Sequence, residues 1–300
     1  MTKIKAELRP EKEFIEQLRS DFDSILREEL RYKGYNPDVI TDIADLAIAY
    51  GSLKARRVES KPRTVHVNPD ILINTSVEYG FENLVKKFEN GENVNPHLSR
   101  LSSNIGSKDL LFYDWGINHF HLGISVEPDG FVSRTGPVAF AIVKENDVYI
   151  ITVAQHGTWT DKSMLEIVET NWPDLLAGNL VNGAFEPIEG TDPLKALRKA
   201  HINMGITLSS GHSYIAIGGG YSSNGVSSLA VIEYNRLIHR FKNLYKYLTN
   251  NITICNGDEY LAKNGNIVNV RLKRVRDEIK IYFEELQGEF GFLNFYPLAN

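Results

Sequence analysis

Residues 109–173 read DLLFYDWGINHFHLGISVEPDGFVSRTGPVAFAIVKENDVYIITVAQHGTWTDKSMLEIVETNWP, and this stretch decides the expected fold. Its hydrophobic pattern is typical of strands up to about Val153 and of a helix after Thr160. Two apolar runs, VAFAIV and VYIITVA, flank the polar turn KEND, which predicts an antiparallel hairpin. The preceding segment, DLLFYDWGINHFHLGISV, predicts one long strand or two short ones. We therefore expect a mostly antiparallel sheet at the centre of the chain.

The flanking regions are expected to combine helices and strands. Apolar residues at spacings of three and four predict helices over residues 10–33, 37–54 and 77–91, and again over 229–248. Residues 252–286 predict two or three further strands. The expected fold class is α+β. It consists of a helical amino-terminal region (1–100), a central sheet domain with the candidate site (101–200) and a carboxy-terminal α/β region (201–300).

The bulk properties are those of an ordinary globular protein. The 300 residues are 42% hydrophobic and 24% charged. The single cysteine, Cys255, cannot form an internal disulfide, which fits a reducing compartment. The amino terminus lacks the apolar run of a signal peptide, and no stretch approaches the ~20 apolar residues that span a bilayer. We expect a cytoplasmic protein without a membrane partner. Its net charge of −5 argues against broad nucleic-acid coating but allows a local basic groove.

Three histidines in this stretch are candidate catalytic residues. On a strand, His119 and His121 share one face, whereas Phe120 points to the other face. His156 follows the second apolar strand, where the chain leaves the sheet. Imidazoles titrate near pH 6.5 and can therefore exchange protons near neutral pH. The alternative is that these histidines are structural residues of the core.

Arg134 is a fourth candidate catalytic residue, and Thr135, Trp159 and Arg57 are candidates for binding the substrate. Arg134, followed by Thr135, can hold a phosphate and stabilise its negative charge. Trp159 can stack on a base, and Arg57 belongs to a basic cluster over residues 54–63. Each has a plainer interpretation as part of an exposed turn, a loop or a solvated helix end. The glycine-rich loop 218–225 has the position of a phosphate cradle, but a turn that precedes a helix is the favoured interpretation.

These candidates predict cleavage of RNA without a metal or cofactor. One imidazole takes the proton of a ribose 2′-OH, another protonates the leaving 5′-oxygen, and Arg134 holds the phosphate oxygens. A second hypothesis gives His119, His121 and His156 to a bound metal ion. A third hypothesis makes the chain a structural or interaction subunit without enzymatic activity.

The order HFHLG, RTG and QHG within residues 109–173 resembles the bacterial toxin-type ribonucleases, the broad group of barnase, EndoU, colicin and RelE-like nucleases. The resemblance implies two catalytic histidines, namely His119 or His121 together with His156, and Arg134 or Thr135 as the third residue. It implies a toxin or antiphage effector that acts on RNA and has a protein partner or antitoxin. The metal hypothesis rests on a looser similarity to the first cupin motif, carried by Gly116, His119, His121, Glu127 and Gly130.

Overall fold

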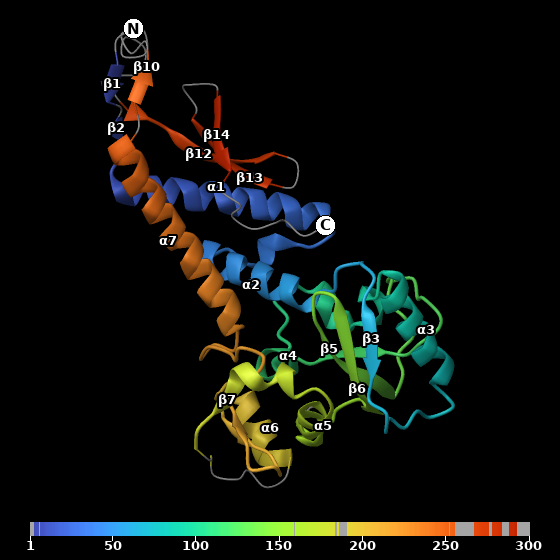
Figure 1. Ribbon diagram of the computed structural model, residues 1–300. Coiled ribbons are helices and arrows are strands. Elements are labelled where there is room, and N and C mark those ends of the chain that lie inside the picture. Colours follow the sequence, from blue (N-terminus) through green and yellow to red (C-terminus); the bar gives the residue numbers. More distant parts are fainter. Residues whose placement is uncertain are drawn as a thin grey trace. The chain divides into compact units, whose positions relative to one another are not determined.

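The computed structural model describes residues 3–5, 7–158, 160–183, 185, 191–251, 253–255, 267–275, 278–283 and 288–292. Helices and mixed sheets make up the chain, so the predicted α+β class is confirmed (Figure 1). The chain forms two compact units. The first combines Met1–Gly51 with Ala230–Asn300, and the second is Ser52–Leu229.

The second unit is built on a four-stranded sheet with the strand order β3-β6-β5-β4. The strands are β3 (Thr64–Val67), β6 (Asp147–Gln155), β5 (Pro137–Val143) and β4 (Asn118–His121). Strands β5 and β6 form the predicted hairpin, and β4 pairs antiparallel with β5, whereas β3 runs parallel to β6. The prediction of a mostly antiparallel central sheet is therefore confirmed.

Each face of this sheet is covered by helices, because its strands are apolar on both faces. Phe120 and Leu122 pack on one face with α3 (Glu78–Asn90). Val138 and Phe140 pack on the other face with α5 (Ser163–Asn171) and α6 (Thr191–Lys199). Figure 1 shows α3 and α5 on opposite sides of the β5–β6 hairpin.

The prediction that strands begin at residue 109 is wrong, because residues 110–115 form helix α4 (Leu110–Trp115). The Asp109 carboxylate accepts a hydrogen bond from the Phe112 N–H at 3.1 Å and so caps the first turn. Gly116 ends the helix in the left-handed conformation, with φ +70°. Only the four residues of β4 remain as a strand, and they include both histidines of the HFH motif.

The glycine-rich loop closes the carboxyl end of α4. The Gly218 N–H donates to the Asp114 carbonyl at 2.7 Å, and the Gly220 N–H donates to the Tyr113 carbonyl at 2.7 Å. A Cβ on Gly218 would lie 2.4 Å from the Phe112 carbonyl oxygen, which only glycine avoids. The backbone groups of Gly218 and Gly220 thus satisfy a helix end, which favours the structural interpretation of residues 218–225.

Short elements complete the second unit. A small sheet has the order β7-β9-β8, with β7 (Leu180–Val181), β9 (Ser213–Tyr214) and β8 (Ile206–Thr207). The 3-10 helices are Asn95–His97, Arg100–Ser103, Pro173–Leu175 and Ala177–Asn179. Arg100–Ser103 contributes to the cavity described below.

The first unit joins the two ends of the chain. It contains α1 (Glu11–Tyr32), the turn Pro37–Val39, and most of α2 (Ile43–Arg56) and α7 (Ser228–Asn251). Strands β12 (Val270–Val275), β13 (Glu278–Phe283) and β14 (Gly288–Phe292) form an antiparallel sheet. β1 (Lys3–Lys5) pairs antiparallel with β10 (Thr253–Cys255), and β2 (Glu7–Leu8) pairs parallel with β11 (Ile267–Val268).

This grouping differs from the expected consecutive regions 1–100, 101–200 and 201–300. The buried Asp21 on α1 forms an ion pair with the partly exposed Arg271 on β12, with Arg271 Nη2 at 2.8 Å from the carboxylate. The amino-terminal helices therefore belong to the same unit as the carboxy-terminal strands. Sequence periodicity identifies the elements but carries no information on such distant pairings.

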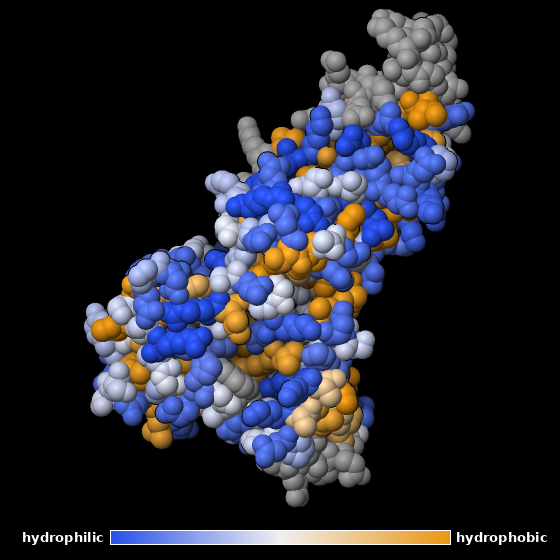
Figure 2. Space-filling view, turned by 180° about the vertical axis from the view of Figure 1, so that it is seen from behind, coloured by the Kyte–Doolittle hydropathy of each residue, from blue (hydrophilic) through white to orange (hydrophobic). Residues whose placement is uncertain are grey.

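The surface gives no sign of a membrane-spanning element in the part of the chain that the structure describes. Among those residues, every helix is too short or too polar to cross a bilayer. Hydrophilic residues cover most of the face in Figure 2, and hydrophobic residues occur there in small groups.

Candidate functional site

The structure brings together the three histidines of the sequence motifs. One nitrogen atom from each of His119, His121 and His156 lies within 4.8 Å of the others. The His121 and His156 rings are stacked, with centroids 5.4 Å apart and planes inclined by 20°. The His119 ring lies edge-on to both, at 6.2 Å from His121 and 5.8 Å from His156. We call this set the histidine cluster.

Strand pairing explains how the histidine cluster forms. In β4, His119 is opposite Phe140 and His121 is opposite Val138, so both imidazoles lie on the sheet face that carries these residues. His156 follows β6 and its N–H donates to the Gly136 carbonyl at 2.7 Å. Because β4 and β6 both flank β5, their histidines meet at the same end of the sheet.

Two further contacts hold His121. The buried His97 contributes its Nδ1 atom to a hydrogen bond with the His121 carbonyl oxygen, at 2.7 Å. The Thr135 N–H faces His121 Nδ1 at 3.5 Å, a long contact that makes Nδ1 the acceptor and leaves the ring proton on Nε2. His121 Nε2 is buried and has no hydrogen-bond partner among the described residues.

All three members of the histidine cluster have lowered pKa values. Burial, together with the positive charge of Arg134 and Arg100 and the proximity of the other two imidazoles, lowers the pKa of His121 from 6.5 to about 4. Burial also lowers the pKa of His119, although the Asp109 carboxylate acts in the opposite direction. The pKa of His156 is lowered by burial and by Arg134. The free protein therefore presents neutral imidazoles at pH 7.

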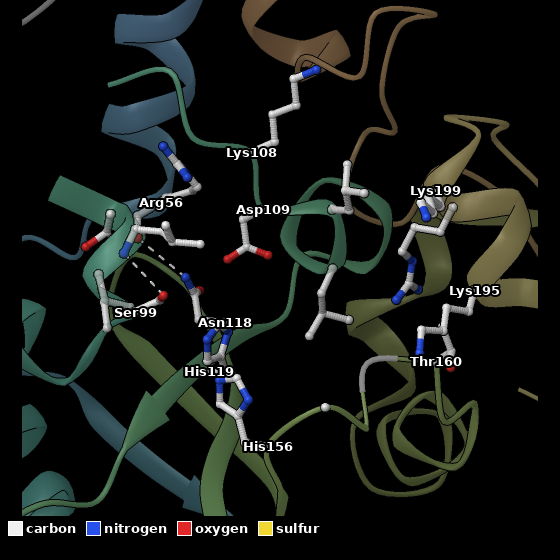
Figure 3. A pocket seen from close by; sticks show the side chains of 17 residues that line it. Arg56, Ser99, Lys108, Asp109, Asn118, His119, His156, Thr160, Lys195 and Lys199 are labelled. Atoms are coloured by element: carbon white, nitrogen blue, oxygen red, sulfur yellow. Dashed lines mark hydrogen bonds between the residues drawn. The ribbon is translucent and has the colours of Figure 1, made fainter. Parts of the chain in front are cut away.

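His119 and His156 line a cavity of about 450 Å³ (Figure 3). Basic side chains enter this cavity from three segments: Arg56 at the end of α2, Lys108 before α4, and Lys195, Arg198 and Lys199 on α6. Asp109 is the acidic residue among its lining residues. Positive charge in a partly enclosed space attracts anions, so the cavity suits a negatively charged ligand.

The cations of this cavity differ in how they are bound. Both Nε and Nη2 of Arg198 donate to the Asp114 carboxylate, at 2.9 and 2.7 Å, and the guanidinium lies over the Trp115 ring at 4.5 Å. Burial raises the pKa of Asp114 even though Arg198 acts to lower it. Arg198 is thus held by the protein itself. Arg56 is different, because its buried Nη2 atom has no hydrogen-bond partner among the described residues.

The fourth predicted catalytic residue, Arg134, and the three predicted substrate-binding residues lie in different surroundings in the structure. Arg134 is exposed and lies close enough to His121 and His156 to lower their pKa values. The Thr135 hydroxyl accepts from the Leu122 N–H at 3.0 Å and donates to the Pro137 carbonyl at 2.6 Å, so it supports the loop rather than offering itself to a substrate. Arg57 is exposed and is not among the cavity-lining residues, whereas Arg56 lines the cavity. Trp159 lies outside the described residues.

The sequence places Arg56 in the basic cluster over residues 54–63, but no sequence pattern singled out Ser102 or the α6 lysines, which also line the cavity. Spacings of four residues, which place side chains on one face of a helix, relate some of these residues to one another. Ser52 and Arg56 are four residues apart on α2, and the Arg56 Nε donates to the Ser52 carbonyl at 3.2 Å. Lys195 and Lys199 are likewise four residues apart and share a face of α6.

Comparison of the chain with known protein families, curated proteins and solved structures finds no match. The resemblance to toxin-type ribonucleases therefore stays a prediction. The cupin-like set gains no support from Glu127, because this residue forms an ion pair with Arg100 and is not part of the histidine cluster.

Proposed function

We propose that the protein cleaves RNA by attack of a ribose 2′-OH on the adjacent phosphate, without a metal ion. The observation that carries this proposal is the histidine cluster at the wall of a cavity lined by basic side chains. Acid–base cleavage of RNA requires two imidazoles near one phosphate and cations that stabilise its charge. Ring separations of 5.4 to 6.2 Å allow different members of the cluster to reach different oxygens of one phosphate.

The reaction consists of one balanced displacement at phosphorus. His119, neutral because its pKa is lowered, takes the proton of the 2′-OH. The 2′-oxygen then bonds to phosphorus while the bond from phosphorus to the 5′-oxygen breaks. His156, the exposed member of the cluster, gives a proton to the departing 5′-oxygen. The products are a 2′,3′-cyclic phosphate and a free 5′-hydroxyl.

His121 has a different role in this proposal. Its Nδ1 faces the Thr135 N–H, so its buried Nε2–H is available to donate to a non-bridging phosphate oxygen. Arg134, which is exposed beside the cluster, adds positive charge at the same phosphate. A bound phosphate favours protonated imidazoles, so the substrate itself raises the lowered pKa of His156 toward the value that a general acid needs.

A three-histidine metal site is the second candidate, because the three nitrogen atoms lie within 4.8 Å of one another. Nitrogen ligands of tetrahedral zinc, each about 2.0–2.1 Å from the ion, lie about 3.3 Å apart, so the side chains would have to close on the ion. The second ring nitrogen of a histidine ligand normally donates to an acceptor. At His121 that nitrogen faces the Thr135 N–H instead, which favours acid–base chemistry.

A cleavage assay with and without EDTA separates these candidates. The substrates are an RNA oligonucleotide and the same oligonucleotide with 2′-deoxyribose throughout. The proposal expects EDTA-resistant cleavage of the RNA alone, with 2′,3′-cyclic phosphate ends. Loss of cleavage in EDTA, together with one equivalent of zinc or iron in elemental analysis, assigns the histidine cluster to a metal. An uncleaved RNA in a metal-free protein refutes both candidates.

A further inference from the structure

We infer that Arg56 and Ser102 form a binding subsite for a phosphate group in the cavity that the histidine cluster borders. This inference rests on the proposed function, because it assigns the subsite to the phosphate of a nucleotide next to the one that is cleaved. Both residues line the cavity, yet neither belongs to the motifs that identified the histidines.

Arg56 is a buried cation whose binding capacity is only partly used. Its side chain is 5% exposed, its Nε donates to the Ser52 carbonyl, and its Nη1 donates to the Ser107 hydroxyl at 2.9 Å. Nη2 is buried and has no hydrogen-bond partner in the part of the chain that the structure describes. An arginine that is buried without a full set of acceptors is costly, so the missing acceptor requires an explanation.

Hydrogen bonds hold both the backbone and the side chain of Arg56 in place. The Asn118 side-chain amide donates to the Arg56 carbonyl at 3.4 Å, and Asn118 immediately precedes His119 in β4. This contact places the end of α2 beside the strand that carries two histidines of the cluster. Figure 3 shows Arg56, Asn118 and His119 along one side of the cavity. Such preorganised cations bind anions without a large cost in side-chain ordering.

Ser102 supplies a second donor. Ser102 is 7% exposed, and its Oγ atom is buried without a hydrogen-bond partner among the described residues. The Ser102 backbone N–H is already bound to the Ser99 carbonyl at 2.8 Å, so the hydroxyl is the group left for a ligand. A hydroxyl can donate to an anion and so complement the Arg56 guanidinium.

The charge of the surroundings selects a phosphate. Asp109 is the acidic residue of the lining, but among the described residues no carboxylate forms an ion pair with Arg56. Lys108 lines the same cavity and adds positive charge. A tetrahedral anion with several acceptor oxygens matches a planar guanidinium, a hydroxyl and an ammonium group together. In an RNA strand, that anion is a phosphodiester close to the cleaved bond.

Calorimetric titration tests the subsite, first with inorganic phosphate and then with a 2′-deoxy dinucleotide with or without an additional 3′-phosphate. The variants are Arg56→Met, which keeps the aliphatic stem, and Ser102→Ala, which removes only the hydroxyl. The matched controls are Ser103→Ala, an exposed neighbour of Ser102, and Arg236→Met, an exposed arginine of α7.

We expect Arg56→Met to weaken phosphate binding about 10- to 100-fold, and Ser102→Ala about 3- to 10-fold, since the arginine supplies a charge as well as a donor, whereas the serine supplies a neutral donor only. The controls should bind within about twofold of the wild type, and the extra 3′-phosphate should strengthen dinucleotide binding only when Arg56 is present.

Wild-type phosphate affinity in Arg56→Met and Ser102→Ala overturns the inference, and so does the absence of phosphate binding in the wild type. In those cases ordered water, and not a ligand, provides the hydrogen bonds of Arg56 Nη2 and Ser102 Oγ. Should Arg56→Met fail to fold, Ser102→Ala decides alone. If phosphate binding depends on Arg56 but RNA is not cleaved, the proposed function is refuted and the subsite stands. If RNA is cleaved but phosphate binding does not depend on Arg56, the subsite is refuted and the proposed function stands.

Discussion

The protein satisfies the buried carboxylates of Asp21 and Glu29 in the first unit, whereas several buried polar groups near the cavity of the second unit have no such partners among the described residues. In the first unit, the buried Asp21 carboxylate accepts from the Arg271 guanidinium, from the Leu272 N–H at 2.9 Å and from the Gln17 amide at 3.0 Å. The buried Glu29 pairs with Lys33 and Arg274. In the second unit, Arg56 Nη2, Ser102 Oγ and His121 Nε2 are buried without partners among the described residues.

This difference distinguishes a structural contact from a binding site. The buried Asp21 carboxylate connects α1 to β12 through the hydrogen bonds that it accepts from Arg271 and Leu272, which makes it a structural contact. Unsatisfied groups around a cavity weaken the free protein, and they become satisfied when a ligand supplies the missing acceptors. The comparison therefore predicts that changes in the first region affect stability, whereas changes in the second affect chemistry and binding.

The largest expected effect is on RNA cleavage by the histidine cluster. His156→Ala and His121→Ala should each lower the cleavage rate by about 10²- to 10⁴-fold, because each removes a group that exchanges or donates a proton at the phosphate. His212→Ala is the control, since His212 is exposed and paired with Glu169. Single-turnover rates measure the effect, and urea unfolding checks the fold. Wild-type rates in both cluster variants would remove the histidines from the mechanism.

The next largest effect concerns the buried Asp21 carboxylate of the first unit. Asp21→Ala leaves Arg271 and the Leu272 N–H without their acceptor, so the free energy of unfolding should fall by about 3–5 kcal/mol. Asp38→Ala is the matched control, because Asp38 is exposed and its pair with Arg31 contributes about 1 kcal/mol at most. Equilibrium urea unfolding provides both values. Equal losses in the two variants would contradict the structural role of Asp21.

A smaller effect is the acid sensitivity that the histidine cluster confers. The folded pKa of His121 is about 4, below the ordinary value of 6.5, so the unfolded chain binds a proton between these values and the folded protein does not. The contribution of His121 to stability is present above pH 6.5 and is lost as the pH falls toward 4, with a slope of up to about 1.4 kcal/mol per pH unit.

Urea unfolding between pH 7.5 and pH 4 measures this slope in the wild type and in His121→Gln. The glutamine variant should show a shallower fall in the free energy of unfolding over this range, because it carries no titrating group at the position. Identical slopes would show that His121 titrates at its ordinary pKa in the folded protein.

The smallest effect is expected at Ser102. Ser102→Ala should change the free energy of unfolding by less than about 0.5 kcal/mol in phosphate-free buffer, because its hydroxyl has no partner to lose in the described structure. The stabilisation that added phosphate gives should be smaller in the variant than in the wild type. A loss of more than about 1 kcal/mol without phosphate would mean that the hydroxyl is already bound in the free protein.

The β5–β6 hairpin and the shared face of two histidines could be predicted from the sequence, because strand residues alternate between faces. The KEND turn between two apolar runs identified the β5–β6 hairpin, and the HFH pattern placed His119 and His121 together. The meeting with His156 depends on β4 and β6 flanking the same strand, which local patterns do not encode.

Other parts of the site depended on features that short patterns do not resolve. Residues 110–115 are mostly apolar and would equally fit a strand, but Asp109 and Gly116 cap them as a helix. Near the end of α2, a shift of one position decides whether an arginine is exposed or buried: the candidate Arg57 is exposed, whereas Arg56 is buried and lines the cavity. The ion pair of Asp21 and Arg271 joins residues 250 apart, beyond the reach of any local rule.

The central claim is that the histidine cluster is neutral in the free protein and binds a phosphate. Its most direct test is an NMR titration of the histidine ring protons with and without inorganic phosphate. We predict that His121 titrates near pH 4 in the free protein, that His119 and His156 also titrate below 6.5, and that phosphate raises the pKa values of the cluster. Three histidines that titrate near 6.5 and do not respond to phosphate would contradict the account.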